Sequence, residues 1–96
     1  MTDSPQRYDI RISSTARKAL THRLPESVAF AAWEFIDGPL RDNPHRVGKP
    51  LGPPFQGCWS ARRGSYRIRY EISEESQIVD VLDIAGRADI YHSGRA

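Results

Sequence analysis

The chain has 96 residues, the size of one domain with a single modest hydrophobic core. Hydrophobic residues make up 39% and charged residues 27%, a balance that excludes a largely disordered chain. No apolar run approaches the ~20 residues of a membrane span, and residues 1–6 resemble no signal peptide. The single cysteine, Cys58, excludes an internal disulfide and a multi-cysteine zinc site. We expect one cytoplasmic domain over residues 1–96, with residues 1–6 disordered.

The basic side chains are mostly arginine. Fourteen basic against twelve acidic residues give a net charge of only +2, and only Lys18 and Lys49 of the basic set are lysine. Arginine contacts phosphate through two parallel hydrogen bonds and stays charged when partly buried. A genome that favours arginine codons explains the composition equally well, so the positions of the arginines have to decide. Four of them fall in residues 60–70, which contain no acid.

The N-terminal part predicts a strand followed by a helix. Residues 8–12 alternate apolar and polar side chains, as in a strand with one buried face. Ser13 or Ser14 can then cap a helix that continues to Leu24.

A second helix is expected to follow at once and to form a hairpin with the first. Pro25 suits its first turn, and Gly38-Pro39 is expected to end it. Because Trp33 lies on the apolar stripe of this helix, we place it in the core. The stripe consists of Ala29, Trp33, Ile36 and Leu40.

The second half predicts a loop and then only strands. Residues 43–56 are rich in proline and glycine and have no periodicity, which indicates a connecting loop. Three strands follow over residues 58–63, 66–72 and 78–85, with short antiparallel connections. The expected fold class is α+β, with the helical hairpin packed on one face of a four-stranded, mostly antiparallel sheet. The expected element order is β-α-α-β-β-β.

The register of the first antiparallel hairpin follows from its turn. Gly64-Ser65 fits a two-residue type II′ turn. This register places apolar residues on one face and arginines on the other, whereas a three-residue loop scrambles both faces. The opposed pairs are then Arg63 with Tyr66, Arg62 with Arg67, Ala61 with Ile68, Ser60 with Arg69, and Trp59 with Tyr70.

Arg62 directly opposite Arg67 is a local electrostatic conflict. Like charges across a strand pair destabilise a sheet by a few tenths to about 1 kcal/mol, and Arg69 adds to the repulsion. Two explanations stay open. An acid nearby neutralises Arg69, or the arginines form a concave basic patch that binds phosphates. The acids in question are Asp80, Asp83 and Glu71.

The C-terminus carries further residues suited to RNA chemistry. Arg87 follows the last strand, and Tyr91 lies four residues later. A tyrosine ring can stack on a base, and its phenol can take or give a proton.

Two sequence stretches carry a resemblance to a known family. The stretch Gly64 to Tyr70 has the pattern Gly-x-Tyr-Arg-x-x-Tyr, and Arg87 to Tyr91 has the pattern Arg-x-Asp-x-Tyr. Together with the Tyr-x-Ile-x-Ile strand, the helical hairpin and the Asn43-Pro44 step, they cover about residues 7–92. Over this length the chain resembles the RelE family within the RelE/ParE toxin superfamily.

The resemblance implies a toxin of a type II toxin–antitoxin system. Such a toxin cleaves mRNA in the ribosomal A site, inhibits translation and growth, and is neutralised by a RelB-like antitoxin. The implied partners are this antitoxin, the ribosome with its mRNA, and operator DNA through the antitoxin complex only, with no membrane. The implied reaction is attack of a ribose 2′-hydroxyl on the adjacent phosphate, and it needs no metal or cofactor. The resemblance assigns no general acid for this reaction, and the histidine candidates are His45 and His92.

The resemblance also assigns roles to residues. Arg67 stabilises the developing negative charge, Arg87 binds phosphate, and Tyr91 stacks on a base and assists the 2′-hydroxyl. Arg62 and Ser60 stand where family members have lysines, so Arg62 joins the expected catalytic set although Ser60 supplies no cation. RNA contacts are expected from Arg69, Ser60 and Arg63.

Two alternatives remain open at this point. A ParE-like gyrase poison shares the fold and lacks the nuclease residues. A catalytically silent subunit would use the basic face only to bind antitoxin and help repress the operon.

Overall fold

The computed structural model describes residues 7–86. The expected disorder of residues 1–6 therefore lies outside the described residues, as do Arg87 and Tyr91. In chain order the elements are β1 (Asp9–Ile12), α1 (Ser14–Lys18), α2 (Glu26–Phe35), α3 (Pro44–Val47), β2 (Lys49–Pro50), β3 (Trp59–Arg63), β4 (Tyr66–Ser73) and β5 (Ile78–Gly86).

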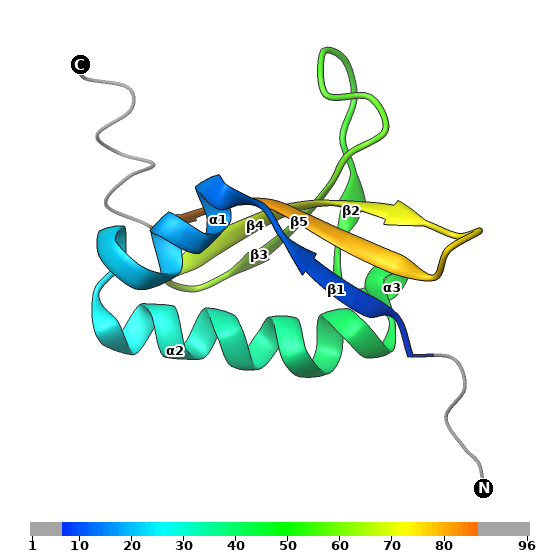
Figure 1. The fold of residues 1–96 in the computed structure, drawn as a ribbon. Coiled ribbons are helices and arrows are strands. Elements are labelled where there is room, and N and C mark those ends of the chain that lie inside the picture. The colour runs from blue at the N-terminus through cyan, green and yellow to red at the C-terminus, as the bar shows by residue number, and fades with distance from the viewer. Residues whose placement is uncertain (1–6, 87–96) are drawn as a thin grey trace, which may run out of the picture.

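The described strands form one sheet in the order β1-β5-β4-β3-β2 (Figure 1). β1 runs parallel to β5, and the other neighbours are antiparallel. The α+β class is confirmed, and the predicted elements occur in the predicted order, with α3 and β2 added between the second helix and β3. The count of four strands is wrong because β2 adds a fifth at the edge. β2 has two residues, one of them Pro50, and proline is tolerated only at an edge because it lacks an N–H.

Residues 43–56 are more ordered than the expected loop, since they contain α3 and β2. Pro44 occupies the first position of α3, where a missing N–H costs nothing. The buried Tyr70 hydroxyl donates a 2.6 Å hydrogen bond to the Pro44 carbonyl and ties α3 to β4. This contact joins residues 26 positions apart, so no local pattern reveals it.

The helical hairpin is confirmed, and Ser13 caps it by accepting a 3.0 Å hydrogen bond from the Ala16 N–H. α1 and α2 each continue as a wider π-helical turn, over Ala19–Arg23 and Ile36–Leu40. The expected helix end at Gly38-Pro39 is therefore wrong. The wider turn accommodates Pro39, and the fully buried Leu40 holds the helix on the core. Within residues 7–86 no helix has the length and apolar character needed to cross a membrane.

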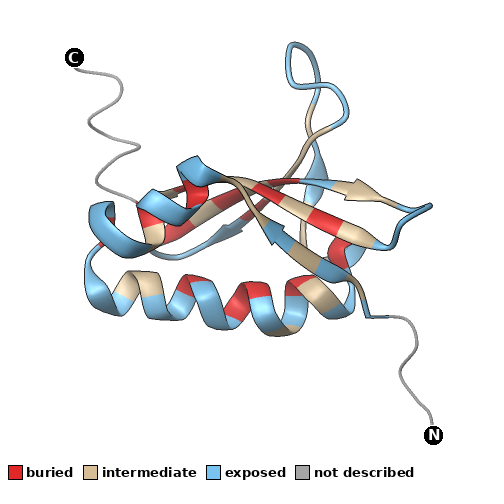
Figure 2. Cartoon of the chain, in the orientation of Figure 1, coloured by how far each residue is buried: buried red, intermediate tan, exposed pale blue. Residues whose placement is uncertain are grey.

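The core lies between the helices and one face of the sheet, where Ala61, Ile68 and Tyr70 are 0% exposed. Figure 2 shows that the buried positions of α2 face the sheet. Placing Trp33 in the core is wrong, because its residue is 41% exposed. The buried side of α2 is centred on Ala32, Phe35 and Ile36, so Trp33 lies on the flank of the helix.

The register of the β3–β4 hairpin is as expected at every pair, including Arg62 opposite Arg67 and Ser60 opposite Arg69. The type II′ turn is wrong, because Gly64 does not adopt the positive φ that this turn requires. The alternation of buried and exposed side chains therefore sets the register.

Candidate nucleic-acid interface

The open side of the β3–β4 hairpin carries arginines without acidic partners. Arg62 and Arg67 lie on adjacent strands as a directly opposed pair. Within residues 7–86 neither of them forms an ion pair. The like-charge pair expected from the sequence is therefore present, and the described part of the chain supplies neither arginine with an ion-pair partner.

The acids that could neutralise Arg69 are engaged elsewhere. Asp83 lies opposite Arg69 in the β4–β5 register, yet its carboxylate pairs with Arg23 at 3.3 Å. Asp80 pairs with Arg11 at 3.0 Å, and the Glu71 carboxylate accepts a 3.8 Å hydrogen bond from the Cys58 thiol.

Arg69 makes a different contact. Its guanidinium lies 5.1 Å from the centre of the Phe55 ring, a cation–π contact. Its Nε is buried and has no hydrogen-bond partner within the described residues. Internal neutralisation of Arg69 is thus not found between residues 7 and 86, which favours an external anion.

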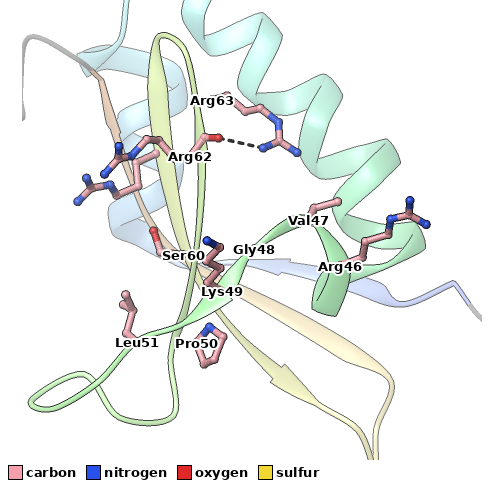
Figure 3. A pocket seen from close by; sticks show the side chains of 10 residues that line it. Arg46, Val47, Gly48, Lys49, Pro50, Leu51, Ser60, Arg62 and Arg63 are labelled. Atoms are coloured by element: carbon pink, nitrogen blue, oxygen red, sulfur yellow. Dashed lines mark hydrogen bonds between the residues drawn. The ribbon is translucent and has the colours of Figure 1, made fainter.

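A cleft of about 700 Å³ opens between the hairpin and the α3–β2 segment (Figure 3). Its lining includes five cationic side chains and no acid. A concave surface of one sign concentrates the field and attracts polyanions. The lining residues are Arg46, Val47, Gly48, Lys49, Pro50, Leu51, Ser60, Arg62, Arg63 and Arg67.

The α3–β2 wall of this cleft was missed at the sequence level. It contributes Arg46 and Lys49, which come from the segment predicted as a plain loop. Gly48 brings this wall close, since a Cβ there would lie 2.2 Å from the Tyr70 hydroxyl and 2.8 Å from the Ser60 carbonyl. The signal available in the sequence was the two basic residues Arg46 and Lys49, which flank Val47-Gly48 with no acid between them.

Arg62 and Arg63 leave β3 on opposite sides (Figure 3). The Arg63 guanidinium lies 4.2 Å from the centre of the Phe35 ring, and its Nη1 donates a 2.9 Å hydrogen bond to the Arg62 carbonyl. Arg63 therefore lines the cleft from the side of α2, held by packing, while Arg62 projects freely.

A second, smaller cavity of about 230 Å³ adjoins the cleft, and the two share Leu51, Ser60 and Arg67. The rest of its lining is Phe55, Arg69, Asp83 and Ala85. The structure thus brings together five of the seven expected site residues around two connected cavities. These are Arg62, Arg63, Arg67, Arg69 and Ser60.

Among the described residues, the larger cavity is lined by no carboxylate or histidine, and Asp83 is the one carboxylate that lines the smaller cavity. A ring nitrogen of His45 contacts the Glu74 carboxylate, and its ring packs edge-on against Trp59 at 5.3 Å. Burial and the neighbouring Glu71 raise the pKa of the Cys58 thiol, which keeps it protonated and unsuited to be a nucleophile. The described residues hold no group of three or more metal-ligating side chains.

Comparison with known proteins identifies the family. Residues 10–91 match the model of the ParE toxin family of type II toxin–antitoxin systems. The chain is 46% identical over 84 residues to Toxin RelE of Mycobacterium tuberculosis, covering 88% of this chain and 86% of that one. Toxin RelG of the same organism is also 46% identical, with 88% and 95% covered. The chain is a RelE-family toxin of the RelE/ParE superfamily.

The fold of this RelE-family toxin agrees with that assignment. It superposes on the solved toxin–antitoxin complex RelBE2 of M. tuberculosis with a TM-score of 0.81 and 43% identity, covering 84% of this chain and 99% of that one. The family model carries the ParE name, whereas both curated relatives carry Rel names. The protein is thus a toxin of a type II toxin–antitoxin system.

Proposed function

We propose that this toxin is a metal-independent endoribonuclease that cleaves mRNA in the ribosomal A site and thereby inhibits translation. The observation that carries the proposal is the opposed pair Arg62 and Arg67, free of ion pairs within residues 7–86, in a cleft with five cations and no acid. Such an arrangement is unfavourable for the isolated fold and becomes favourable when a phosphate is bound.

The chemistry suits fixed cations. The ribose 2′-oxygen bonds to the adjacent phosphorus, the bond to the 5′-oxygen breaks, and a 2′,3′-cyclic phosphate remains. Negative charge builds on the phosphoryl oxygens in the transition state, and preorganised donors that meet it there supply a large catalytic term. Arg67 and Arg62 are proposed to be these donors, with Arg87 binding phosphate.

Proton transfer needs another group, because arginine stays protonated at neutral pH. A base must take the 2′-hydroxyl proton, and an acid must protonate the departing 5′-oxygen. We assign the first role to Tyr91 or a ribosomal group, and Tyr91 also stacks on a base. Arg69, Ser60 and Arg63 are proposed to contact the RNA around the scissile phosphate.

A cognate RelB-like antitoxin is the second proposed partner. The RelBE2 relative, on which this chain superposes, was solved as a toxin–antitoxin complex. A cationic cleft can receive acidic antitoxin residues, and this would block the RNA site directly. Operator DNA would be contacted only through the antitoxin in that complex, and the toxin would act in the cytoplasm.

The proposal is tested by inducible expression in a bacterial host at matched protein levels. The variants are wild type, Arg67→Ala, and Arg17→Ala as a control that removes one exposed arginine from α1. Growth is followed together with primer extension on an abundant message. We expect arrest and codon-register cuts with wild type and Arg17→Ala, and a loss of both with Arg67→Ala.

Other outcomes point to the alternatives. The family model names ParE toxins, so arrest without cuts, equal for wild type and Arg67→Ala, would indicate a gyrase poison. Absence of arrest, with Arg67→Ala weakening antitoxin binding in a salt-dependent way, would indicate a silent antitoxin-binding subunit.

A further inference from the structure

We propose that the smaller cavity beside Phe55 binds one base of the RNA next to the phosphate held at Arg67. The inference rests on the proposed function for the identity of the RNA, and it assigns a base site that the cationic cleft does not supply. Cations in the cleft can hold phosphates of any sequence. A separate pocket with an aromatic wall and polar edges can read a base.

The size and lining of this cavity suit one planar ring. Its volume is about 230 Å³, below the ~300–1,000 Å³ typical of pockets for larger ligands. Leu51, Phe55 and Ala85 give it apolar walls, and Ser60, Arg69 and Asp83 give it polar groups. This lining is complementary to a nucleobase, which has two apolar faces and a polar edge.

Phe55 is held in place although it is exposed. It lies in the loop of residues 51–58, which stands away from the sheet on the side opposite α2 (Figure 1). Its N–H donates to the Gly52 carbonyl at 2.9 Å, and its carbonyl accepts from the Cys58 N–H at 2.9 Å. Gly57, at φ +96°, allows the loop to close, because other residues rarely adopt this backbone conformation.

The Phe55 ring is exposed on an ordered loop, where it forms a surface on which a base can stack. Phe55 is 48% exposed, and its ring is backed by the Arg69 guanidinium. Bases stack on aromatic rings and on arginine planes, so this pair forms a ready platform. A loop that only connects β2 to β3 would not require an aromatic residue at this position.

Asp83 supplies a hydrogen-bond acceptor at the polar edge. Its Oδ1 accepts hydrogen bonds from Arg23 at 3.3 Å and from the Ile84 N–H at 2.8 Å. Its Oδ2 has no partner within residues 7–86. A carboxylate oxygen accepts from exocyclic amino groups, which adenine, cytosine and guanine carry and uracil lacks. The site therefore favours an amino-bearing base over uracil.

The position of the cavity connects it to the catalytic cleft. Leu51, Ser60 and Arg67 line both cavities, so a phosphate at Arg67 and a base beside Phe55 would belong to neighbouring parts of one strand. Arg67 at the scissile phosphate and Arg69 behind the Phe55 ring come from the same strand, β4.

The test is equilibrium binding of fluorescent oligonucleotides to the full-length toxin. The probes are a 2′-O-methyl oligoadenylate, which cannot be cleaved, and an abasic oligomer with the same number of phosphates. The variants are Phe55→Ala, Phe55→Tyr, and Phe30→Ala as a matched control, since Phe30 is 64% exposed on α2. Thermal unfolding verifies that each variant is folded.

We expect Phe55→Ala to weaken binding of the oligoadenylate about tenfold and to leave binding of the abasic oligomer unchanged. Phe55→Tyr keeps the ring and should bind like wild type, as should Phe30→Ala. A third probe, a 2′-O-methyl oligouridylate, tests the polar edge. Asp83→Asn should reduce the preference for oligoadenylate over this oligouridylate. Equal effects of Phe55→Ala on both probes, or no effect on either, would overturn the base site. So would a loss of antitoxin affinity alone, which would make Phe55 a protein contact.

The base site and the proposed nuclease activity fail separately. Wild-type toxin that distinguishes the two probes through Phe55 but does not cut mRNA on the ribosome would keep the base site and refute the nuclease. The base site alone would be refuted if wild-type toxin cuts mRNA and Phe55→Ala cuts the same codons and binds each probe with the wild-type affinity.

Discussion

The two faces of the β3–β4 hairpin contribute to the stability of the fold in opposite directions. On one face Ala61 and Ile68 are 0% exposed and pack into a single core with the helices. On the other face Arg62 and Arg67 stand opposite each other, with no ion pair inside the described chain. Every contact on the first face supports the fold, and the charge pair on the second face opposes it.

This difference separates what the fold needs from what the function needs. Sequences tend to agree with their fold at each level, and the positions that disagree are commonly functional. The apolar face fixes the register, and the same register forces the arginines together. The hairpin thus converts packing energy into a preorganised cluster of cations, which then needs no rearrangement to meet a phosphate.

The largest expected effect on stability comes from comparing substitutions at two adjacent residues of β4, one on each face of the hairpin. Ile68→Ala should lower the free energy of unfolding by about 2–5 kcal/mol, because it leaves a cavity in the core. Arg67→Ala, one position away, should change that free energy little or raise it, because it relieves a like-charge pair. Chemical denaturation of both variants measures the contrast. Similar losses of stability in both would show that Arg67 has a structural role, and the comparison would fail.

How much of this fold could be predicted depends on the range of the contacts involved. Alternation along residues 58–72 specified both strands and their register, because one face had to be buried. The turn type was not specified by the sequence, because glycine tolerates both signs of φ, and Gly64 does not take the positive φ of a type II′ turn. The end of the second helix was also missed, because burial of Leu40 outweighs the local preference of Gly38-Pro39.

The candidate site was predictable only where it lies on the hairpin. Arg62, Arg67 and Arg69 followed from the register. Arg46 and Lys49 did not, because the segment that carries them has no periodicity and is positioned by the distant Tyr70.

An intermediate effect is expected at the hydrogen bond that holds this second wall. Tyr70→Phe leaves the Pro44 carbonyl without its 2.6 Å partner, which should cost about 1–3 kcal/mol of stability. Because α3 then loses its tie to β4, ribosomal cleavage should also fall, although less than in Arg67→Ala. Urea unfolding and the primer-extension assay measure the two effects. The control is Tyr8→Phe, which removes a hydroxyl that donates to the exposed Glu74 carboxylate at 3.0 Å. Unchanged stability would show that the bond does not anchor α3.

The same tyrosine predicts a dependence on alkaline pH. Burial raises the pKa of Tyr70 from 10.0 to about 12. The protonated phenol is therefore favoured in the folded state, and this contribution to stability is complete below pH 10 and is lost as pH rises through about 12. Wild type should lose stability more steeply across this window than Tyr70→Phe. Equal slopes in the two proteins would contradict the burial of an undissociated phenol at this position.

The smallest effect is expected from Arg62→Gln, and it should have opposite signs on the two sides of the comparison. Removing one charge of the opposed pair should raise the free energy of unfolding by a few tenths to about 1 kcal/mol. The same change should weaken binding of the abasic oligomer and reduce the slope of log affinity against log salt by about 0.7, the value for one phosphate contact on a single strand. A matched substitution, Arg11→Gln, breaks a pair with Asp80 and should stabilise nothing. A gain in stability with an unchanged salt slope would show that Arg62 and Arg67 repel each other but that Arg62 does not contact the phosphate. A lower stability would mean that Arg62 supports the fold, and the division between the two faces would no longer hold.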